Sequence, residues 1–486
     1  MNELPKGWSL VKLEGVVDKI IGGGTPSKSQ PSYYTGSIPW MTVKDMNKTF
    51  LTDTIDHITE EAVANSSTNI IPAGVPIIAT RMSLGKIIRA SFDSAINQDL
   101  KALFINEQVN QYFFEHWYRS QAMKIESLGT GTTVKGIRLE VLKDLDFPFA
   151  PLAEQKRIVE KLDQVLAQVD TIKARLDGIP VILKRFRQSV LAAAVSGKLT
   201  EEWRKSTSVK APNINEIKKY WKVQYDLSGK KFKSANLSEK ESFISLPNSW
   251  LITQIGDVCD VFVGATPSRK KLEYWNGDIP WVSSSEVAFC RISSTKELIT
   301  VEGLSDTSTQ VHPIGTVMLA MIGQGKTRGQ VAILDIEACH NQNTAALRVP
   351  NGYILPGFLY FFLTKQYEET RRIGAGNNQK ALNKSFVQSL SFPLPPIEEQ
   401  TEIVRLVDQY FAFAETIEAQ VQKAQQRVDK LTQSILAKAF RGELVPQDPN
   451  DEPADELLKR LATARAEAEA LAKAAKKATK KTSKKA

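Results

Sequence analysis

The chain repeats itself, and this internal repeat constrains the fold more than any other feature of its 486 residues. Short motifs of the first half recur in the same order in the second half. The matched pairs are Leu4-Pro5-Lys6-Gly7-Trp8 with Leu246-Pro247-Asn248-Ser249-Trp250, Thr25-Pro26-Ser27 with Thr266-Pro267-Ser268, Ile38-Pro39-Trp40 with Ile279-Pro280-Trp281, Asn97-Gln98 with Asn341-Gln342, and Gln188-Ser189-Val190-Leu191-Ala192 with Gln433-Ser434-Ile435-Leu436-Ala437. Because the spacing between matched positions stays nearly constant, we infer two copies of one structural unit.

Residues 1–150 and 246–395 form the first part of each copy and have the sequence of an α+β domain. Short apolar runs such as Val75–Ala79 lie between clusters of Gly, Pro, Ser and Thr, a pattern typical of strands between turns. Two aromatic-rich stretches, Gln111–Ile125 and Pro356–Ile373, are expected to be helices. The pattern predicts an α+β fold for each copy.

Residues 151–204 and 396–445 are predicted to be long helices. Their apolar residues recur at alternating intervals of three and four, which is typical of a coiled-coil seam. The seam residues are Ile158, Leu162, Val165, Val169, Ile172 and Leu176 in the first helix, and Ile403, Val407, Tyr410, Ile417, Val421, Val428, Leu431 and Ile435 in the second. Asp177-Gly178-Ile179-Pro180 is expected to kink or interrupt the first helix, because proline lacks a backbone donor. Gly197 and Gly442 are expected to cap the C-termini.

Two seams in one chain pair most simply with each other. A parallel pair would bring both α+β domains to the same end, where they would collide. We therefore predict that the long helices separate the two duplicated domains and pair as an antiparallel coiled coil with pseudo-two-fold symmetry. The alternative is that each seam binds another protein.

The remaining segments are 205–245, expected to be a polar linker, and 446–486, a Lys/Ala-rich tail in which Asp455–Ala478 is expected to form a solvated helix. The formal net charge is +9, but residues 471–486 hold seven lysines and no acidic residue. The rest of the chain is therefore close to neutral, so composition alone does not predict nucleic-acid binding. The tail is expected to attract polyanions only loosely.

The residue patterns typical of catalysis and metal binding are missing. None of the four histidines has metal-ligand spacing with another histidine or a cysteine, and no nucleophile elbow occurs. Ala320–Thr327 resembles a Walker A loop, but the residues after it predict a strand instead of the required helix. The three cysteines lack close pairing, and no run is apolar enough for a signal peptide or a membrane helix. We predict a cytoplasmic, non-catalytic protein without a metal site.

The ordered motifs resemble those of the specificity (S) subunits of type I restriction–modification enzymes. Each copy opens with Leu-Pro-x-x-Trp, continues with Thr-Pro-Ser and Ile-Pro-Trp, and closes on Phe-Pro-x-x-Pro-x-x-Glu-Gln before its long helix. No single motif is specific by itself. Their duplicated order is highly specific, and the resemblance covers residues 1–445.

The resemblance implies a function for each segment. Each α+β part would be a target recognition domain that reads one half of a split, asymmetric sequence in double-stranded DNA. The long helices would fix the gap between the half-sites and dock two methyltransferase (M) subunits, and restriction (R) subunits would join in the holoenzyme. S-adenosylmethionine, ATP and Mg²⁺ would bind to these partners, with no cofactor on this chain.

Loops that differ between the two copies are where two different half-sites could be read. Arg, Lys, Asn and Gln contact base edges, whereas Ser, Thr and Lys anchor phosphates. The candidate DNA-binding residues are Lys28, Lys44, Arg81, Lys86, Thr132, Thr133 and Lys135 in the first copy, and Arg269, Ser283, Ser284, Gln324, Lys326, Arg328, Asn377, Asn378 and Lys380 in the second. Residues that both copies share, such as Trp8 and Trp250, are interpreted as common scaffold.

Two other classes of protein are weighed against this interpretation. A coiled-coil scaffold would bind protein partners and touch nucleic acid only through its basic tail, and it would leave no sequence-specific footprint. A P-loop ATPase would need Lys326 for its activity, whereas a specificity subunit has no ATPase activity to lose.

Overall fold

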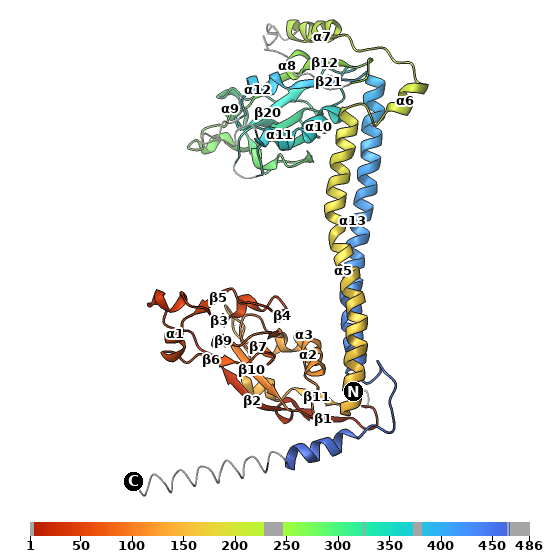
Figure 1. Cartoon of the computed structure of the whole chain (residues 1–486). Coiled ribbons are helices and arrows are strands. Elements are labelled where there is room, and N and C mark those ends of the chain that lie inside the picture. Colours follow the sequence, from red (N-terminus) through yellow and green to blue (C-terminus); the bar gives the residue numbers. More distant parts are fainter. Residues whose placement is uncertain (1–3, 228–245, 324–325, 373–381, 464–465, 467–486) are drawn as a thin grey trace. The chain divides into compact units, whose positions relative to one another are not determined.

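The computed structural model describes residues 4–227, 246–323, 326–372, 382–463 and 466, and the chain divides into two compact units. Unit 1 comprises Met1–Asp177 and Lys423–Ala486, and unit 2 comprises Gly178–Gln422. Each unit contains one α+β part and roughly half of each long helix. The elements are labelled in Figure 1.

The α+β part of unit 1 is built on two sheets and a strand pair. The five-stranded sheet has the order β2 (Val17–Gly22), β10 (Leu100–Ile105), β7 (Ile77–Ala79), β8 (Ile87–Ala90) and β4 (Phe50–Leu51). The four-stranded sheet has the order β5 (Asp56–Ile58), β3 (Ile38–Met41), β9 (Ser94–Ile96) and β6 (Asn69–Ile71). β1 (Ser9–Lys12) pairs antiparallel with β11 (Asp146–Phe149). The helices are α1 (Glu60–Ala64), α2 (Gln111–Ser120), α3 (Ala122–Leu128) and α4 (Leu139–Lys143).

Unit 2 repeats this topology. Its five-stranded sheet has the order β13 (Asp260–Val263), β20 (Thr344–Arg348), β17 (Val317–Ala320), β18 (Val331–Leu334) and β15 (Cys290–Ile292). Its smaller sheet has three strands, β16 (Glu297–Ile299), β14 (Trp275–Val282) and β19 (Cys339–His340), and β12 (Leu251–Gln254) pairs with β21 (Ser391–Leu394). The helices are α8 (Ile255–Val258), α9 (Val301–Ser305), α10 (Pro356–Lys365), α11 (Tyr367–Arg372) and α12 (Lys384–Ser389). The predicted duplication and α+β class are confirmed.

Aromatic helices close the core of each unit. In α2, Phe113, Phe114 and Trp117 are fully buried and pack on Phe147 of β11. In unit 2, α10 plays the same role against β21. Apolar side chains three and four positions apart share one helix face, so each helix covers the core with a single stripe.

The two long helices are α5 (Leu152–Val195) and α13 (Ile397–Ala439), and they pair antiparallel within each unit. In unit 1, Lys173 Nζ lies 2.9 Å from Asp429 Oδ1, and Gln425 Nε2 donates to Asp177 Oδ1 at 2.7 Å. In unit 2, Arg187 donates two hydrogen bonds to Glu418 at 2.8 and 3.0 Å. Partner numbers fall along α13 as they rise along α5, which confirms the predicted direction.

The seam prediction is wrong at Ile172, Tyr410 and Leu431, which are 46%, 39% and 49% exposed. None of the α5 residues after Val169 in unit 1 is buried. The α+β part covers only the first turns of the helix there, and two helices alone leave the edges of a seam in contact with water. The other seam residues are buried or partly buried.

The predicted interruption of α5 does not occur, since the helix is assigned without a break through Pro180. The predicted caps are present. Gly197 and Gly442 adopt positive φ angles of 76° and 73°, the left-handed conformation that glycine accommodates at a helix C-terminus.

The described part of the predicted polar linker, residues 205–227, contains a packed helix. α6 (Glu201–Ser206) is followed by α7 (Ile214–Leu227), which buries Ile217 and Trp221 in the core of unit 2. The indole of Trp221 donates to the carbonyl oxygen of Val258 at 2.9 Å. Two apolar side chains one helical turn apart are enough to attach α7 to the core, because the neighbouring α8 forms the surface on which they pack.

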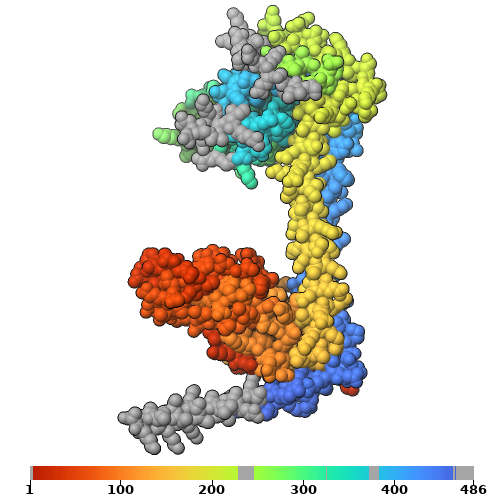
Figure 2. Space-filling view, in the orientation of Figure 1, coloured from red at the N-terminus to blue at the C-terminus, as the bar shows by residue number. Residues whose placement is uncertain are grey.

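The tail is likewise not wholly solvated. Residues 454–463 are helical and bury Ala454, Leu457 and Leu461 in the core of unit 1. Figure 2 shows this blue segment lying directly against the α+β part and helices of unit 1. The segment is the counterpart of α7, so each unit is completed by a helix that follows the end of a long helix. Within the described residues, no helix is long and apolar enough to cross a membrane.

Candidate nucleic-acid interface

One tight turn occupies the same place in both units. In unit 1 it joins β9 to β10, and the side-chain oxygen of Asn97 accepts a hydrogen bond from the backbone N–H of Asp99 at 3.1 Å. In unit 2, Asn341 accepts from the N–H of Asn343 at the same distance. Asn and Asp favour such turns because their side chains bond the backbone two residues on. The residue between, Gln98 or Gln342, is exposed. We call these the Gln turns.

A loop after β2 holds the first Gln turn in place. The N–H of Gly24 donates to the carbonyl oxygen of Ile96 at 3.0 Å. A Cβ atom on Gly23 would lie 1.9 Å from that same oxygen, so only glycine permits the approach. The hydroxyl of Thr25 then donates to the amide oxygen of Gln98.

The second Gln turn is held by the same bonds. The N–H of Ala265 donates to the carbonyl oxygen of His340 at 3.0 Å, and a Cβ on Gly264 would lie 1.9 Å from it. The hydroxyl of Thr266 donates to the amide oxygen of Gln342 at 2.5 Å. The frame around the exposed glutamine is therefore duplicated bond for bond.

The buried tryptophans of the Ile-Pro-Trp motifs hydrogen-bond to the loops that hold the Gln turns. The indole of Trp40 donates to the carbonyl oxygen of Gly24 at 3.3 Å, and that of Trp281 donates to Ala265 at 3.0 Å. They pack beneath the loops, as expected for scaffold.

A capped loop lies beside each Gln turn. The backbone N–H of Thr42 donates to Asp45 at 2.8 Å, and that of Ser283 donates to Glu286 at 2.8 Å. The Ser283 hydroxyl also donates to Glu286 at 2.8 Å, so this candidate DNA contact is already used within the protein. Ser284 is half-buried in the same turn.

In unit 1 the loops enclose a hollow of about 600 Å³. Its lining includes Lys28, Tyr34, Lys44 and Gln98. Lys44 Nζ lies 2.9 Å from Asp56 Oδ2, and this hydrogen bond raises the pKa of Lys44 above its ordinary value. Two predicted DNA-binding lysines and the exposed glutamine thus share one concave surface.

In unit 2 an arginine occupies the equivalent surface. Arg269 forms two hydrogen bonds with Glu297, and its guanidinium lies 3.7 Å from the ring centroid of Trp275. These hydrogen bonds lower the pKa of Glu297. Glu297 sits opposite Trp281 in the strand register, as Asp56 sits opposite Trp40. The same sheet position therefore carries a carboxylate in both units and holds a different cation in each.

The remaining candidates of unit 1 lie outside this hollow. Arg81 Nη1 lies 3.5 Å from Asp99 Oδ1, and Arg81 forms a backbone bridge with Gly136. This bridge places Arg81 next to the loop that contains three exposed candidates. They are Thr132, Thr133 and Lys135. Lys86 is exposed and donates to the Asn47 side chain at 2.7 Å.

The counterpart loops of unit 2 are only partly described. Lys326 is exposed, whereas Arg328 donates to the carbonyl oxygen of Arg371 at 2.8 Å and is half-buried. Four candidates lie outside the described residues. They are Gln324, Asn377, Asn378 and Lys380.

The Walker A resemblance is not matched by the backbone. After Thr327 the chain turns at Gly329, with φ +85°, and enters strand β18. A phosphate-binding loop must open a helix whose N-terminus faces the phosphates. The structure contradicts the P-loop interpretation.

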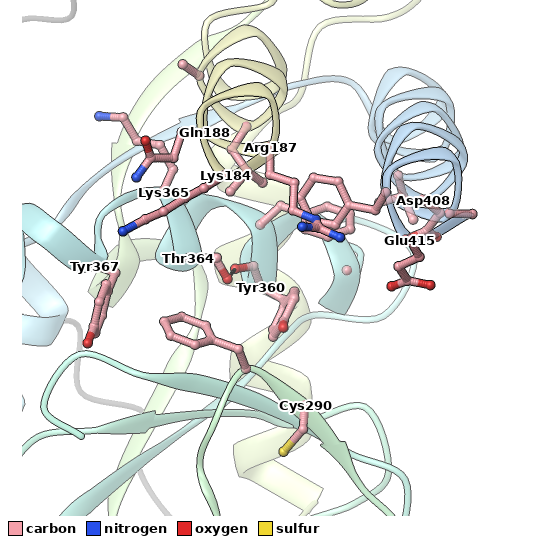
Figure 3. A pocket seen from close by; sticks show the side chains of 18 of the residues that line it. Lys184, Arg187, Gln188, Cys290, Tyr360, Thr364, Lys365, Tyr367, Asp408 and Glu415 are labelled. Carbon is pink, nitrogen blue, oxygen red and sulfur yellow. Dashed lines mark hydrogen bonds between the residues drawn. The ribbon is translucent and has the colours of Figure 1, made fainter. Parts of the chain in front are cut away.

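Unit 2 also has a hollow of about 1110 Å³ between α5, α10 and α13 (Figure 3). Its lining mixes Lys184, Arg187 and Gln188 from α5 with Asp408 and Glu415 from α13. Such a mixture favours neither an anionic nor a cationic ligand. In the described residues, no group of three or more His, Cys, Asp or Glu is placed to hold a metal ion.

Sequence reasoning missed the residues at the centre of the interface. Gln98 and Gln342 serve only as markers of the repeat, and Asp56 and Glu297 are not singled out. The available signal is a glutamine that both copies place directly after the shared Asn97 or Asn341.

Comparison with known proteins agrees with this geometry. The family described as type I restriction modification DNA specificity domain matches residues 5–181 and again residues 247–425. The chain is 32% identical to the type I restriction enzyme StySPI specificity subunit of Salmonella potsdam, over 92% of this chain and 91% of that protein. It is 30% identical to the EcoKI specificity subunit of Escherichia coli strain K12, over 92% and 91%.

Solved structures share the fold. The HsdS subunit of Thermoanaerobacter tengcongensis aligns with a TM-score of 0.55 at 20% identity, covering 91% of this chain and 98% of that one. A structure described as the basis of complex assembly and conformational transition of the type I R-M system aligns with a TM-score of 0.61 at 20% identity, covering 91% and 100%. The chain belongs to the family of specificity subunits of type I restriction–modification systems.

Proposed function

We propose that this chain reads a split, asymmetric sequence in double-stranded DNA, with one half-site recognised by each unit. The observation that supports the proposal is that the same hydrogen bonds support both Gln turns, whereas the carboxylate of the adjacent sheet holds a different cation in each unit. Two faces with one architecture and different side chains are suited to two related but unequal half-sites. The chain itself directs methylation and restriction without catalysing either.

The side chains of the two faces support this division. The Arg269 guanidinium is held on Trp275 by two hydrogen bonds to Glu297, which use two of its five N–H donors, and arginine commonly contacts guanine in the major groove. Lys28 is an exposed, flexible point charge of the kind that contacts phosphates. The two faces therefore combine base readers and phosphate anchors in different proportions.

The paired helices are proposed to set the gap between half-sites and to dock two methyltransferase subunits, through which restriction subunits join. Exposed apolar side chains on the helices support docking, because water-exposed apolar patches commonly mark protein contacts. They are Ile172 and Leu431 in unit 1, and Tyr410 and Phe413 in unit 2. S-adenosylmethionine, ATP and Mg²⁺ are proposed to bind to the partner subunits in the cytoplasm.

The test is an adenine-methylation map of cells with and without this gene, followed by an exchange of residues 1–150 for those of another specificity subunit. We expect one divided motif to disappear on deletion, and the exchange to alter one half of it only. If both halves changed, separate recognition would be refuted. If the protein bound its partners but left no sequence-specific footprint on DNA, it would be a scaffold.

The spacer role has its own test. Inserting one heptad into both α5 and α13 should lengthen the gap of the methylated motif and leave both half-sites unchanged. An unchanged gap in an active complex would contradict the role of the helices as a spacer.

A further inference from the structure

We propose that Gln98 and Gln342 each read an adenine through the major groove, one in each half-site, so that the two half-sites share an A·T pair at the corresponding position. This inference rests on the proposed function. It adds which residues read a base and which base they select.

The first argument is the exposure of the glutamines. Asn97 and Asp99 are buried on either side of Gln98, and Asn341 is buried before Gln342. The glutamine side chain is exposed in both units and contributes nothing to a core. Both units contain the same exposed glutamine, supported by the same hydrogen bonds. A common ligand explains this glutamine better than packing does.

The second argument comes from what surrounds the glutamines. Lys28 of unit 1 is matched by Arg269, Lys44 by Ser285, and Asp99 by Asn343. The neighbours thus differ in charge and in hydrogen-bonding capacity, whereas the glutamine stays the same. What differs between the faces can read what differs between the half-sites, so the constant residue should read what they have in common.

The third argument is the orientation of the amide. Thr25 and Thr266 each donate a hydroxyl hydrogen to the amide oxygen, which distinguishes the oxygen end of the glutamine from its nitrogen end. Among the described residues, these contacts leave the other lone pair of the oxygen and the NH₂ group available. This acceptor–donor pair matches the N6 donor and N7 acceptor of adenine.

Other DNA groups fit this amide less well. Guanine offers two acceptors on its major-groove edge, so one end of the amide would face a like group. A phosphate offers only acceptors, so it could bond the NH₂ group but would leave the second lone pair of the amide oxygen unused. A held carbonyl beside a free NH₂ group therefore favours adenine.

Gln98→Glu is the informative substitution. Glutamate still accepts the hydrogen bond from Thr25, so the turn keeps its support, but the NH₂ donor to N7 is lost. The matched control is Gln30→Glu, which places the same charge in the neighbouring loop at an exposed glutamine whose hydrogen bonds involve only its backbone.

The experiment expresses each variant with its partner subunits and maps the methylated motif. For Gln98→Glu we expect preference for A·T at one position of one half-site to fall about 5- to 150-fold, the range of one bidentate base contact. Gln342→Glu should act on the other half-site, and Gln30→Glu should leave the motif unchanged. Normal recognition of the untouched half-site shows in each case that the variant folds and assembles.

A duplex that carries 7-deazaadenine at the identified position tests the contact at one atom. The wild-type complex should lose affinity for it, and the Gln98→Glu complex should not. An unchanged motif, or equal weakening on all sequences, would overturn the inference in favour of a structural strut or a phosphate contact. If the wild-type complex had no divided motif at all, the proposed function would fail instead.

Discussion

The surfaces around the two Gln turns share one set of supporting hydrogen bonds and differ in how they hold their cations. The carboxylate of Asp56 pairs with Lys44 from the capped loop of unit 1, whereas Glu297 at the same register pairs with Arg269 from the loop that supports the Gln turn. The carboxylate at this sheet position thus pairs with a cation from one loop in unit 1 and from a different loop in unit 2. The difference teaches that the cation on the surface can change through a loop while the sheet beneath stays the same.

The two units also anchor their aromatic helix differently. In α2 the buried carboxylate of Glu115 forms ion pairs with Arg89 and Arg119. The position matched to Glu115 in α10 is Tyr360, and burial raises the pKa of its hydroxyl to about 12. Unit 1 therefore depends on a charged cluster at a place where unit 2 uses an aromatic ring.

The largest expected effect comes from breaking that cluster. Glu115→Ala leaves two partly buried guanidinium groups without their partner, which should cost unit 1 about 3–5 kcal/mol. Tyr360→Phe, the control in unit 2, should cost no more than about 1 kcal/mol. Hydrogen exchange resolved by segment reports each unit separately. Equal loss in both units would contradict the comparison.

The completing helices should be equivalent in the two units. Leu457→Ala in unit 1 and Ile217→Ala in unit 2 each remove a fully buried side chain and should cost about 2–5 kcal/mol in the affected unit. Lys459→Ala, on the same helical segment as Leu457 but exposed, serves as the control. Were Leu457→Ala to leave unit 1 unchanged, the role of the C-terminal helix in its core would be refuted.

Acidic pH should lower the stability of unit 2 more than that of unit 1. In unit 2, His312 and His340 are joined at 3.1 Å, with Arg348 donating to His312 at 3.0 Å. Burial lowers the pKa of His340 to about 4 and that of His312 still further. Both are neutral in the folded state, and a histidine in an unfolded chain titrates near pH 6.5. Their full contribution to stability is therefore present above pH 6.5 and is lost as the pH falls towards 4.

Unit 1 has a single comparable group, His116, whose pKa burial lowers while its hydrogen bond to Asp163 opposes the shift. Hydrogen exchange at pH 7 and pH 5, corrected for intrinsic rates, should show protection falling more in β19 and β20 than in β9 and β10. The reverse order would refute this prediction.

Arg269→Lys keeps the positive charge and removes the planar guanidinium. It therefore tests whether the geometry of the cation, and not its charge alone, distinguishes the two faces. We expect discrimination at one position of one half-site to fall about 5- to 150-fold, since lysine cannot reproduce a bidentate contact. The methylation map provides the measurement. A motif that stays intact would show that Arg269 only braces the loop.

Lys28→Ala should have the smallest effect. Removing a positive charge that binds phosphate should weaken binding about equally on all sequences and reduce the slope of log affinity against log salt by about 1. Titration of the assembled complex at several salt concentrations measures that slope. Relaxed specificity at a single position would instead identify Lys28 as a base reader.

The repeat was enough to predict most of the fold. Matched motifs predicted two α+β parts, and the seam predicted the antiparallel helices. The tail helix was predicted but expected to be solvated, whereas α7 was missed. α7 buries only Ile217 and Trp221, too few apolar residues to form a pattern without the surface that receives them. Burial at Ile172 was wrongly predicted because periodicity does not reveal where the covering domain ends.

The candidate site could be predicted only in part. Differences between the copies pointed to Lys28, Lys44 and Arg269, and these lie on the faces described above. The Gln turns could not be found this way, because exposure of Gln98 depends on an Asn97 turn and a Thr25 hydrogen bond between distant segments. Arg328 was selected for its charge, yet the structure ties it to the backbone of Arg371.

The discontinuity of unit 1 has a consequence for how the protein is made. Unit 2 is one continuous segment, whereas the core of unit 1 needs Phe440, whose ring lies 5.2 Å from that of Phe113, together with Leu457 and Leu461. A ribosome therefore synthesises every residue of unit 2 before those that complete unit 1. The half of the protein that emerges first becomes complete last, and until then the aromatic face of α2 is a surface for chaperones to protect.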